Sequence, residues 1–255
     1  MCLINFHINE HPTYKIILAA NRDESYSRPT APAQFWSDEP TILAGRDLLQ
    51  SGTWLGITKT GRIAALTNYR DPSLPTNGKI SRGEIIRNYL AGNLSPKDYL
   101  TALNEEKDLY TGFNVIVGNP DELFYYNNLE SNIVEIEEGT HGLSNHFLDT
   151  PWPKVLNGKR MLREYVLQNE TVEEDQLFEI LSKEDLAEDQ DLPSTGVGID
   201  LERQLSPLFI KTENYGTRSS TVLTIDNDDK VTFIERTYDK GLFKKQNKFE
   251  FKIDK

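Results

Sequence analysis

The helices that the sequence predicts come in sequential pairs between groups of strands, and this order constrains the fold most. One pair is expected within residues 81–103, and a second covers about 152–167 and 171–182. Alternating apolar segments precede, separate and follow these pairs. A doubly wound parallel sheet needs single helices alternating with strands, so this order disfavours it. We expect an α+β fold of two stacked, mainly antiparallel sheets with helical pairs packed outside them.

Three of the predicted helices carry start signals. Ser81 with Glu84 and Thr171 with Glu174 have the spacing of a capping box. Ser95 precedes a proline, which is tolerated at the first helical position. These signals predict where the helices begin.

Short strands account for most of the remaining chain. Asn9 to Pro12 has turn chemistry, so the first two strands should pair as a hairpin, and Lys59 to Gly61 predicts a second hairpin turn. Residues 184–198 are acidic and contain glycine, which predicts a mobile loop. We find no repeat and no linker, so residues 1–255 are expected to form one domain. The predicted strands are 2–8, 15–20, 53–58, 62–68, 113–117, 122–126, 133–136, 219–226, 230–238 and 248–253.

Composition excludes several classes of protein. A formal net charge of −12 argues against nucleic-acid binding, which needs a concentrated Lys/Arg face. No apolar run approaches the ~20 residues that span a bilayer, and no signal peptide is visible. One cysteine cannot form a disulfide within the chain, which suits a reducing compartment. We therefore expect a cytoplasmic protein without a membrane span; the sequence leaves its oligomeric state open.

Cys2 is the first candidate for chemistry. Removal of Met1 is expected because residue 2 is small, and it would put a thiol and an α-amino group on one residue. The amine has a pKa near 8 and can act as a general base, while the thiol is a strong nucleophile. A small buried residue at a strand start is the structural alternative.

Four polar residues lie beside Cys2 in the predicted hairpin: Asn21, Arg22, Asp23 and Glu24. An arginine near the thiol would favour the thiolate, and a carboxylate would hold the ammonium. A solvated loop with a local ion pair is the alternative.

Two asparagines and one arginine complete the candidate site. Asn68 ends an apolar run and Asn145 precedes a proline-rich break; either amide could donate to an oxyanion or simply cap a turn. Arg218 precedes a strand and could bind a substrate carboxylate or form a surface ion pair. The four histidines lack metal-ligand spacing, so neither a metal nor a cofactor is expected.

These motifs resemble one family over nearly the whole chain. The opening Met-Cys-Leu-Ile, the unbroken Asn21–Glu24 motif, the segments 54–56 and 67–70, and Leu143 to Asn145 followed by Pro-Trp-Pro-Lys fit the NRDE family, also called the transport and Golgi organisation protein 2 family. The family is associated with secretory organisation, lipid and acyl-CoA metabolism and haem handling. It does not by itself imply a reaction.

A more distant similarity implies a mechanism. The layout is similar to choloylglycine-hydrolase-type N-terminal nucleophile hydrolases, which have an αββα sandwich. The resemblance makes Cys2 the nucleophile. It assigns Arg22 and Asp23 (or Glu24) to the support of that nucleophile. Asn68 and Asn145 would contact the oxyanion or the amine, and Arg218 would match an arginine that comes late in the chain.

One departure from that pattern concerns the arginine and its acid. The hydrolase group separates them by three residues, whereas Arg22 and Asp23 are adjacent and would face opposite sides of an extended strand. Either the chain bends there, or Asn21 and Glu24 are the inward pair.

We expect a hydrolase of amide or related acyl bonds in a small molecule. The alternative is a non-catalytic binder or carrier of an apolar ligand such as a lipid, acyl-CoA or haem. Trp36, Trp54 and Trp152 could line such a pocket, although core packing is the more common role of tryptophan.

Overall fold

A computed structural model describes residues 2–254, and its strands form two antiparallel sheets. The first sheet contains both ends of the described chain. Its strands, in spatial order, are β10 (Gly139–Leu143), β1 (Cys2–Ile8), β2 (Tyr14–Ser25), β11 (Tyr215–Asp226), β12 (Lys230–Asp239) and β13 (Leu242–Lys252).

The second sheet is built from consecutive strands of the middle of the chain. Each strand pairs with the next one in sequence, so this sheet is a meander. Its strands are β3 (Thr30–Phe35), β4 (Ile42–Asp47), β5 (Leu55–Thr58), β6 (Ile63–Asn68), β7 (Phe113–Asn119), β8 (Glu122–Asn127) and β9 (Ile133–Glu135).

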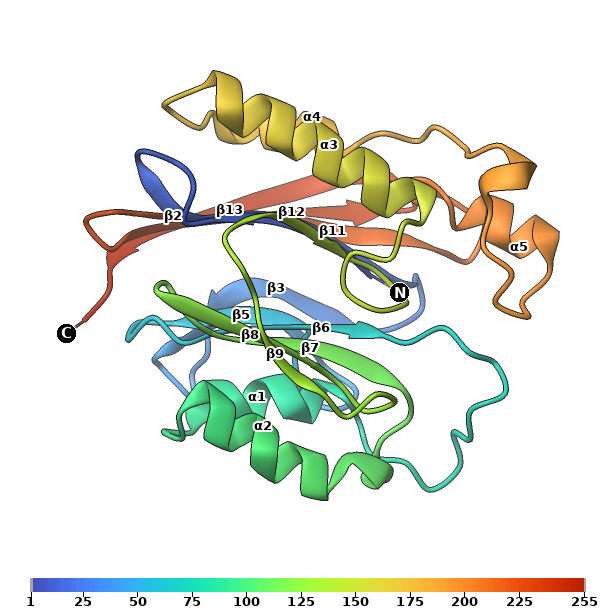
Figure 1. Cartoon of the computed structure of the whole chain (residues 1–255), viewed down its shortest axis with the longest axis horizontal. Coiled ribbons are helices and arrows are strands. Elements are labelled where there is room, and N and C mark those ends of the chain that lie inside the picture. Colours follow the sequence, from blue (N-terminus) through green and yellow to red (C-terminus); the bar gives the residue numbers. More distant parts are fainter. Residues whose placement is uncertain (1, 255) are drawn as a thin grey trace.

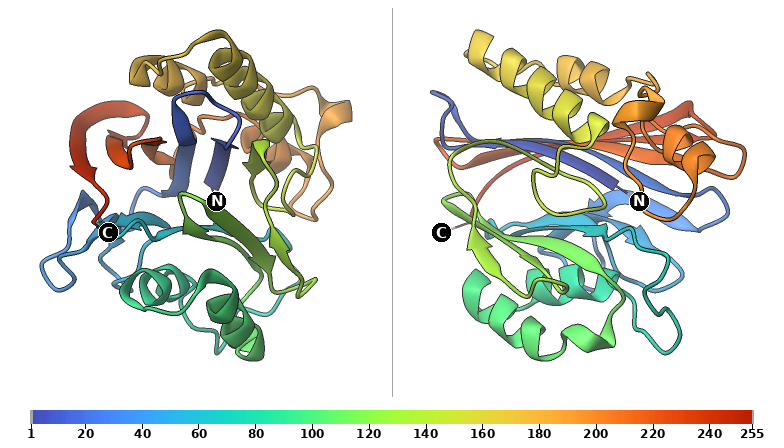
Figure 2. Two further views of the ribbon diagram at one scale, coloured as in Figure 1. Left: turned by 60° about the vertical axis from the view of Figure 1, so that its left-hand side comes forward. Right: turned by 45° about the vertical axis from the view of Figure 1, so that its right-hand side comes forward.

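Helical pairs cover the outer faces of both sheets (Figures 1 and 2). The pair α1 and α2 packs on the second sheet, and α3 and α4 pack on the first. The four-layer αββα sandwich expected from the sequence is confirmed. The helices are α1 (Gly83–Ala91), α2 (Pro96–Glu105), α3 (Pro153–Gln168), α4 (Glu174–Leu181) and α5 (Ile199–Gln204), with 3-10 turns at Lys107–Leu109 and Asp189–Asp191.

The alternation of β1 explains the layering. Cys2, Ile4 and Phe6 belong to the core between the sheets, whereas Leu3 packs with Trp152 beneath α3. Successive side chains of a strand point to opposite faces, so one strand contributes to two cores. The same alternation orients the polar residues at the end of β2.

The structure confirms the predicted hairpins and most strands, and it corrects several details. The sequence reading missed β3, β4, β10 and α5, and it ended β2 five residues too early. Both predicted capping boxes are wrong: α1 and α4 begin after Arg82 and Glu173, without a side-chain cap. The Ser95 cap is confirmed, since its hydroxyl accepts the Asp98 backbone N–H.

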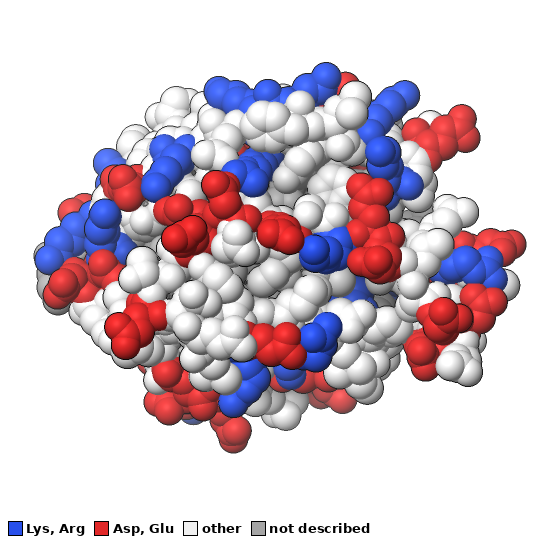
Figure 3. Space-filling view, turned by 90° about the horizontal axis from the view of Figure 1, so that it is seen from above, with Lys and Arg blue, Asp and Glu red and all other residues white. Residues whose placement is uncertain are grey.

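The outer face over α3 and α4 intermixes acidic and basic side chains (Figure 3). The pairs Arg160–Glu164 and Arg163–Glu10 are ion pairs at this surface. Among the described residues, no helix combines the length and apolar character needed to cross a bilayer.

Candidate functional site

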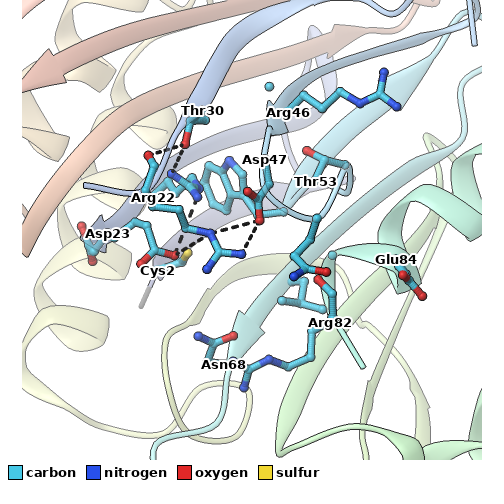
Figure 4. A pocket seen from close by; sticks show the side chains of 18 of the residues that line it. Cys2, Arg22, Asp23, Thr30, Arg46, Asp47, Thr53, Asn68, Arg82 and Glu84 are labelled. Carbon is cyan, nitrogen blue, oxygen red and sulfur yellow. Dashed lines mark hydrogen bonds and ion pairs between the residues drawn. The ribbon is translucent and has the colours of Figure 1, made fainter. Parts of the chain in front are cut away.

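A cavity of about 570 Å³ opens between the two sheets at the end where β1 begins. Residues of β1 and β2 line it from one sheet, and residues of β6 line it from the other. The segment 76–84, which leads into α1, and residues of β3 and β4 form further parts of the wall. Most of the lining side chains are polar or charged (Figure 4).

Cys2 lies in the wall of this cavity. The hairpin pairs Cys2 with Arg22 across the antiparallel strands, as the sequence predicted. The Cys2 residue is 8% exposed, and burial raises the pKa of its thiol. The charge of Arg22 and a hydrogen bond from the Asp23 backbone N–H lower that pKa in part. The thiol therefore needs a nearby base to form the thiolate at neutral pH.

The side chains at the end of β2 alternate between the cavity and the helical layer. Arg22 shares the cavity side of the sheet with Cys2, and it lies 3.7 Å from a carboxylate oxygen of Glu24. Asn21 faces the other way: its amide donates to the carbonyls of Leu181 and Leu208. The two inward pairs expected from the sequence, Arg22 with Asp23 or Asn21 with Glu24, are therefore both wrong. The side chains keep alternating, and Arg22 pairs with Glu24 on the cavity side.

Asp23 is buried beneath α3, where its carboxylate accepts a hydrogen bond from Thr217 at 2.8 Å. Burial raises the pKa of Asp23, and the charge of Lys154 opposes that rise. Lys154 is 2% exposed, and burial lowers its pKa to about 8. In the sequence Lys154 stands out only as the last residue of the Pro-Trp-Pro-Lys motif, and nothing there signals its place beside Asp23.

The two candidate asparagines lie in contact, but only one reaches the cavity. Asn68 ends β6 and lines the cavity, on the sheet opposite Cys2 (Figure 4). Asn145 is fully buried, and its amide donates to the Asn68 backbone carbonyl at 2.9 Å. Asn145 therefore supports the end of β6 from behind.

Arg218 lies outside the cavity lining. It occupies a β-bulge in β11, and its Nη1 donates to the carbonyls of Ser25, Tyr26 and Arg28. These bonds hold the loop that follows β2.

Two of the lining residues that the sequence reading missed carry charge close to Cys2. Arg82 immediately precedes α1, and Glu235 lies on β12. Glu235 is buried, accepts the Ala33 backbone N–H at 2.6 Å, and has its pKa raised to about 7 by burial. The available signal was an acidic residue directly after the mostly apolar run Val231 to Ile234. No group of three or more acidic, histidine or cysteine side chains suited to a metal occurs within residues 2–254.

Glu235→Gln should stabilise the protein increasingly as the pH rises above about 4.5, with nearly the full effect reached by pH 8. The carboxyl pKa rises from 4.5 unfolded to about 7 folded, so the folded state binds more protons in that window and wild-type stability falls as pH rises through it. Glutamine stays neutral and can still accept the Ala33 N–H. Urea unfolding should show the variant about 3 kcal/mol more stable at pH 8 and equal near pH 4.5. A constant difference across this range would contradict the assignment.

Comparisons with known proteins agree with this architecture. The family described as Transport and Golgi organisation 2 matches residues 1–240. The transport and Golgi organization protein 2 homologs of Bos taurus and Homo sapiens are each 36% identical, with 93% of both chains covered. The Drosophila melanogaster protein is 28% identical over 93% of this chain and 92% of its own.

A solved hydrolase structure has a similar fold. It is the C2A mutant of conjugated bile acid hydrolase from Clostridium perfringens, with a TM-score of 0.58 and 11% identity. The match covers 98% of this chain and 92% of that one. The expected N-terminal nucleophile hydrolase-like fold is thus confirmed.

Proposed function

The chain belongs to the Transport and Golgi organisation 2 family, and we propose that it is an N-terminal-cysteine hydrolase of amide or related acyl bonds in a small molecule. One observation carries the proposal. Cys2, the only cysteine, lies in the wall of a polar cavity, across from Arg22 and on the sheet opposite Asn68.

The reaction uses the amine and thiol of one residue. Removal of Met1 frees the α-amine of Cys2, which takes the thiol proton. The thiolate attacks the substrate carbonyl, and the ammonium then protonates the leaving amine or alcohol as its bond to carbon breaks. Water, deprotonated by the same amine, cleaves the acyl-enzyme and releases the acid.

Asp23 and Lys154 prepare the amine for this task. In the antiparallel pairing, the N-terminal side of Cys2 runs past Arg22 toward Asp23. An ionised Asp23 would hold the Cys2 ammonium and keep it next to the thiol. Lys154 favours the ionised form of Asp23, because its charge opposes the cost of burying that carboxylate.

Asn68 is the proposed oxyanion donor. It faces the cavity from the sheet opposite Cys2, so its amide can approach an acyl carbonyl attacked by the thiolate. Asn145 holds the end of β6 in place, Asn21 fastens the helical layer to β2, and Arg218 fixes the following loop. We assign these last three residues positioning roles without direct substrate contact.

An apolar ligand suits this cavity poorly. Of the three tryptophans, only Trp54 is among its lining residues, whereas Trp36 and Trp152 belong to cores beneath the helices. A lipid or haem would bury the lining guanidinium and carboxylate groups against apolar surface, which is costly. The polar lining favours a small polar substrate.

Untagged protein mixed with a panel of N-acyl amino acids, amides and esters should convert at least one of them. Asn68→Ala should then lower kcat about 10²–10³-fold, because one oxyanion donor is lost. Steady-state kinetics would measure this, with exposed Asn157→Ala as the matched control. Mass spectrometry of quenched reactions should find the acyl group on the Cys2 peptide. Turnover with acylation elsewhere would refute the assignment of Cys2.

A further inference from the structure

Two guanidinium groups face the cavity from opposite sheets. Arg22 is on β2 and pairs with Cys2, while Arg82 precedes α1, which packs on the second sheet. Both line the cavity, and both lie within electrostatic reach of the Cys2 sulfur. In Figure 4 the Arg82 side chain extends toward Asn68, whereas Glu84 points away from it.

These two arginines are less neutralised than the other cavity arginines. Arg28 forms a short ion pair with Asp47, and Arg46 binds Asp38 through two contacts of 2.6 Å. In contrast, Nη2 of Arg22 lies 3.7 Å from the Glu24 carboxylate, which is too far for a hydrogen bond.

Arg82 donates to the Gly112 carbonyl at 3.0 Å. Within residues 2–254, no ion pair involves it. A half-buried guanidinium without a close carboxylate leaves donors that an anion can fill.

The remaining carboxylates do not take this place. The Asp23 carboxylate accepts a hydrogen bond from Thr217, and in the proposed mechanism it holds the Cys2 ammonium rather than either arginine. The Glu235 carboxylate accepts the Ala33 backbone N–H. Burial raises its pKa to about 7, so about half of the Glu235 carboxyl groups are neutral at pH 7. Arg22 and Arg82 thus keep guanidinium donors beside the proposed nucleophile that no carboxylate of the described residues occupies within 3.5 Å.

We propose that the site selects substrates with an anionic group, a carboxylate or a phosphate, close to the scissile acyl bond, and that Arg22 and Arg82 bind this group. The inference rests on the proposed function, because it needs Cys2 to be the reacting group. The planar forks of two arginines suit the oxygens of either anion. A neutral amide of the same shape would lose these contacts.

Paired alkylating reagents test the selection without a known substrate. Iodoacetate and iodoacetamide have the same leaving group and differ mainly in charge, so their rate ratio at Cys2 cancels thiolate reactivity. We expect the ratio of iodoacetate to iodoacetamide rates to exceed that of free cysteine about tenfold or more. Arg82→Met and Arg22→Met should each reduce it toward the free-cysteine value, and Arg82→Lys should retain most of it. Exposed Arg160→Met is the control that should change nothing.

Competition by small anions identifies the bound group, and two labelling results would contradict the proposal. Protection of Cys2 by butyrate but not by inorganic phosphate would assign a carboxylate, and the reverse would assign a phosphate. A wild-type ratio equal to that of free cysteine, with Cys2 still labelled by both reagents, would overturn the anion selection and leave the hydrolase proposal standing. Failure of both reagents to label Cys2 would remove the nucleophile and overturn both proposals.

Discussion

Cys2→Ala is expected to lower turnover about 10³-fold or more, because no other thiol in the chain can replace the nucleophile. Alanine is small, so removal of Met1 should continue and the variant should keep its free amine. The Cys2 site is buried in the core between the sheets, where alanine fits with little loss of packing. Hydrolysis of the best substrate from the acyl panel would measure the effect.

Two controls separate the thiol from the amine. A chain with an uncleaved N-terminal tag keeps the thiol but lacks the free amine, and it should be inactive as well. Thermal unfolding would confirm that both forms fold. Full activity of either form would contradict the mechanism, since each lacks one of its two reacting groups.

Arg70→Met should destabilise the protein by about 3–5 kcal/mol, because it leaves a buried carboxylate without its cation. Arg70 donates to Glu202 at 2.6 Å, and both residues are buried. Its guanidinium also stacks over the Trp152 ring, and its backbone N–H donates to the Asn145 carbonyl at 2.7 Å. The pair thus ties α5 to the segment that supports Asn68.

Chemical denaturation would measure the loss, and the double variant Arg70→Met/Glu202→Gln should recover part of it. The matched surface change is Arg160→Met, which breaks an exposed pair with Glu164 and should cost under about 0.5 kcal/mol. An equal, small effect of both changes would show that the buried pair does not hold α5.

The sequence predicted the fold class well because its signals were strong and local. Paired helices and alternating strands favoured antiparallel layers, and the turn at Asn9–Pro12 placed Arg22 beside Cys2. The capping boxes failed because spacing alone does not place the backbone: α1 starts two residues after Ser81, and α4 starts at Glu174 itself. Strand β3 was missed because Pro32 interrupts its pattern, and β4 was missed because its short apolar run, Ile42 to Ala44, does not alternate with polar residues.

The candidate site was only partly predictable for a different reason. The nucleophile and its strand neighbour follow from one hairpin, which is a local feature. Arg82 reaches the site from the residue before α1, and Lys154 and Glu235 reach it from α3 and β12. Sequence alone does not fix such long-range packing. Whether Asp23 or Glu24 faces the cavity depends on whether the strand stays extended there. In the structure β2 continues to Ser25, so its side chains alternate and Glu24 lies on the cavity side.

Labelling of untagged protein with a cyanobenzothiazole tests the central claim most directly, because this reagent condenses with a thiol and an amine on the same residue. Intact mass should show loss of Met1 and one adduct, and the adduct should be absent from Cys2→Ala and from the tagged chain. Retained Met1, or a free N-terminus that the reagent does not modify in the folded protein, would contradict an N-terminal cysteine nucleophile.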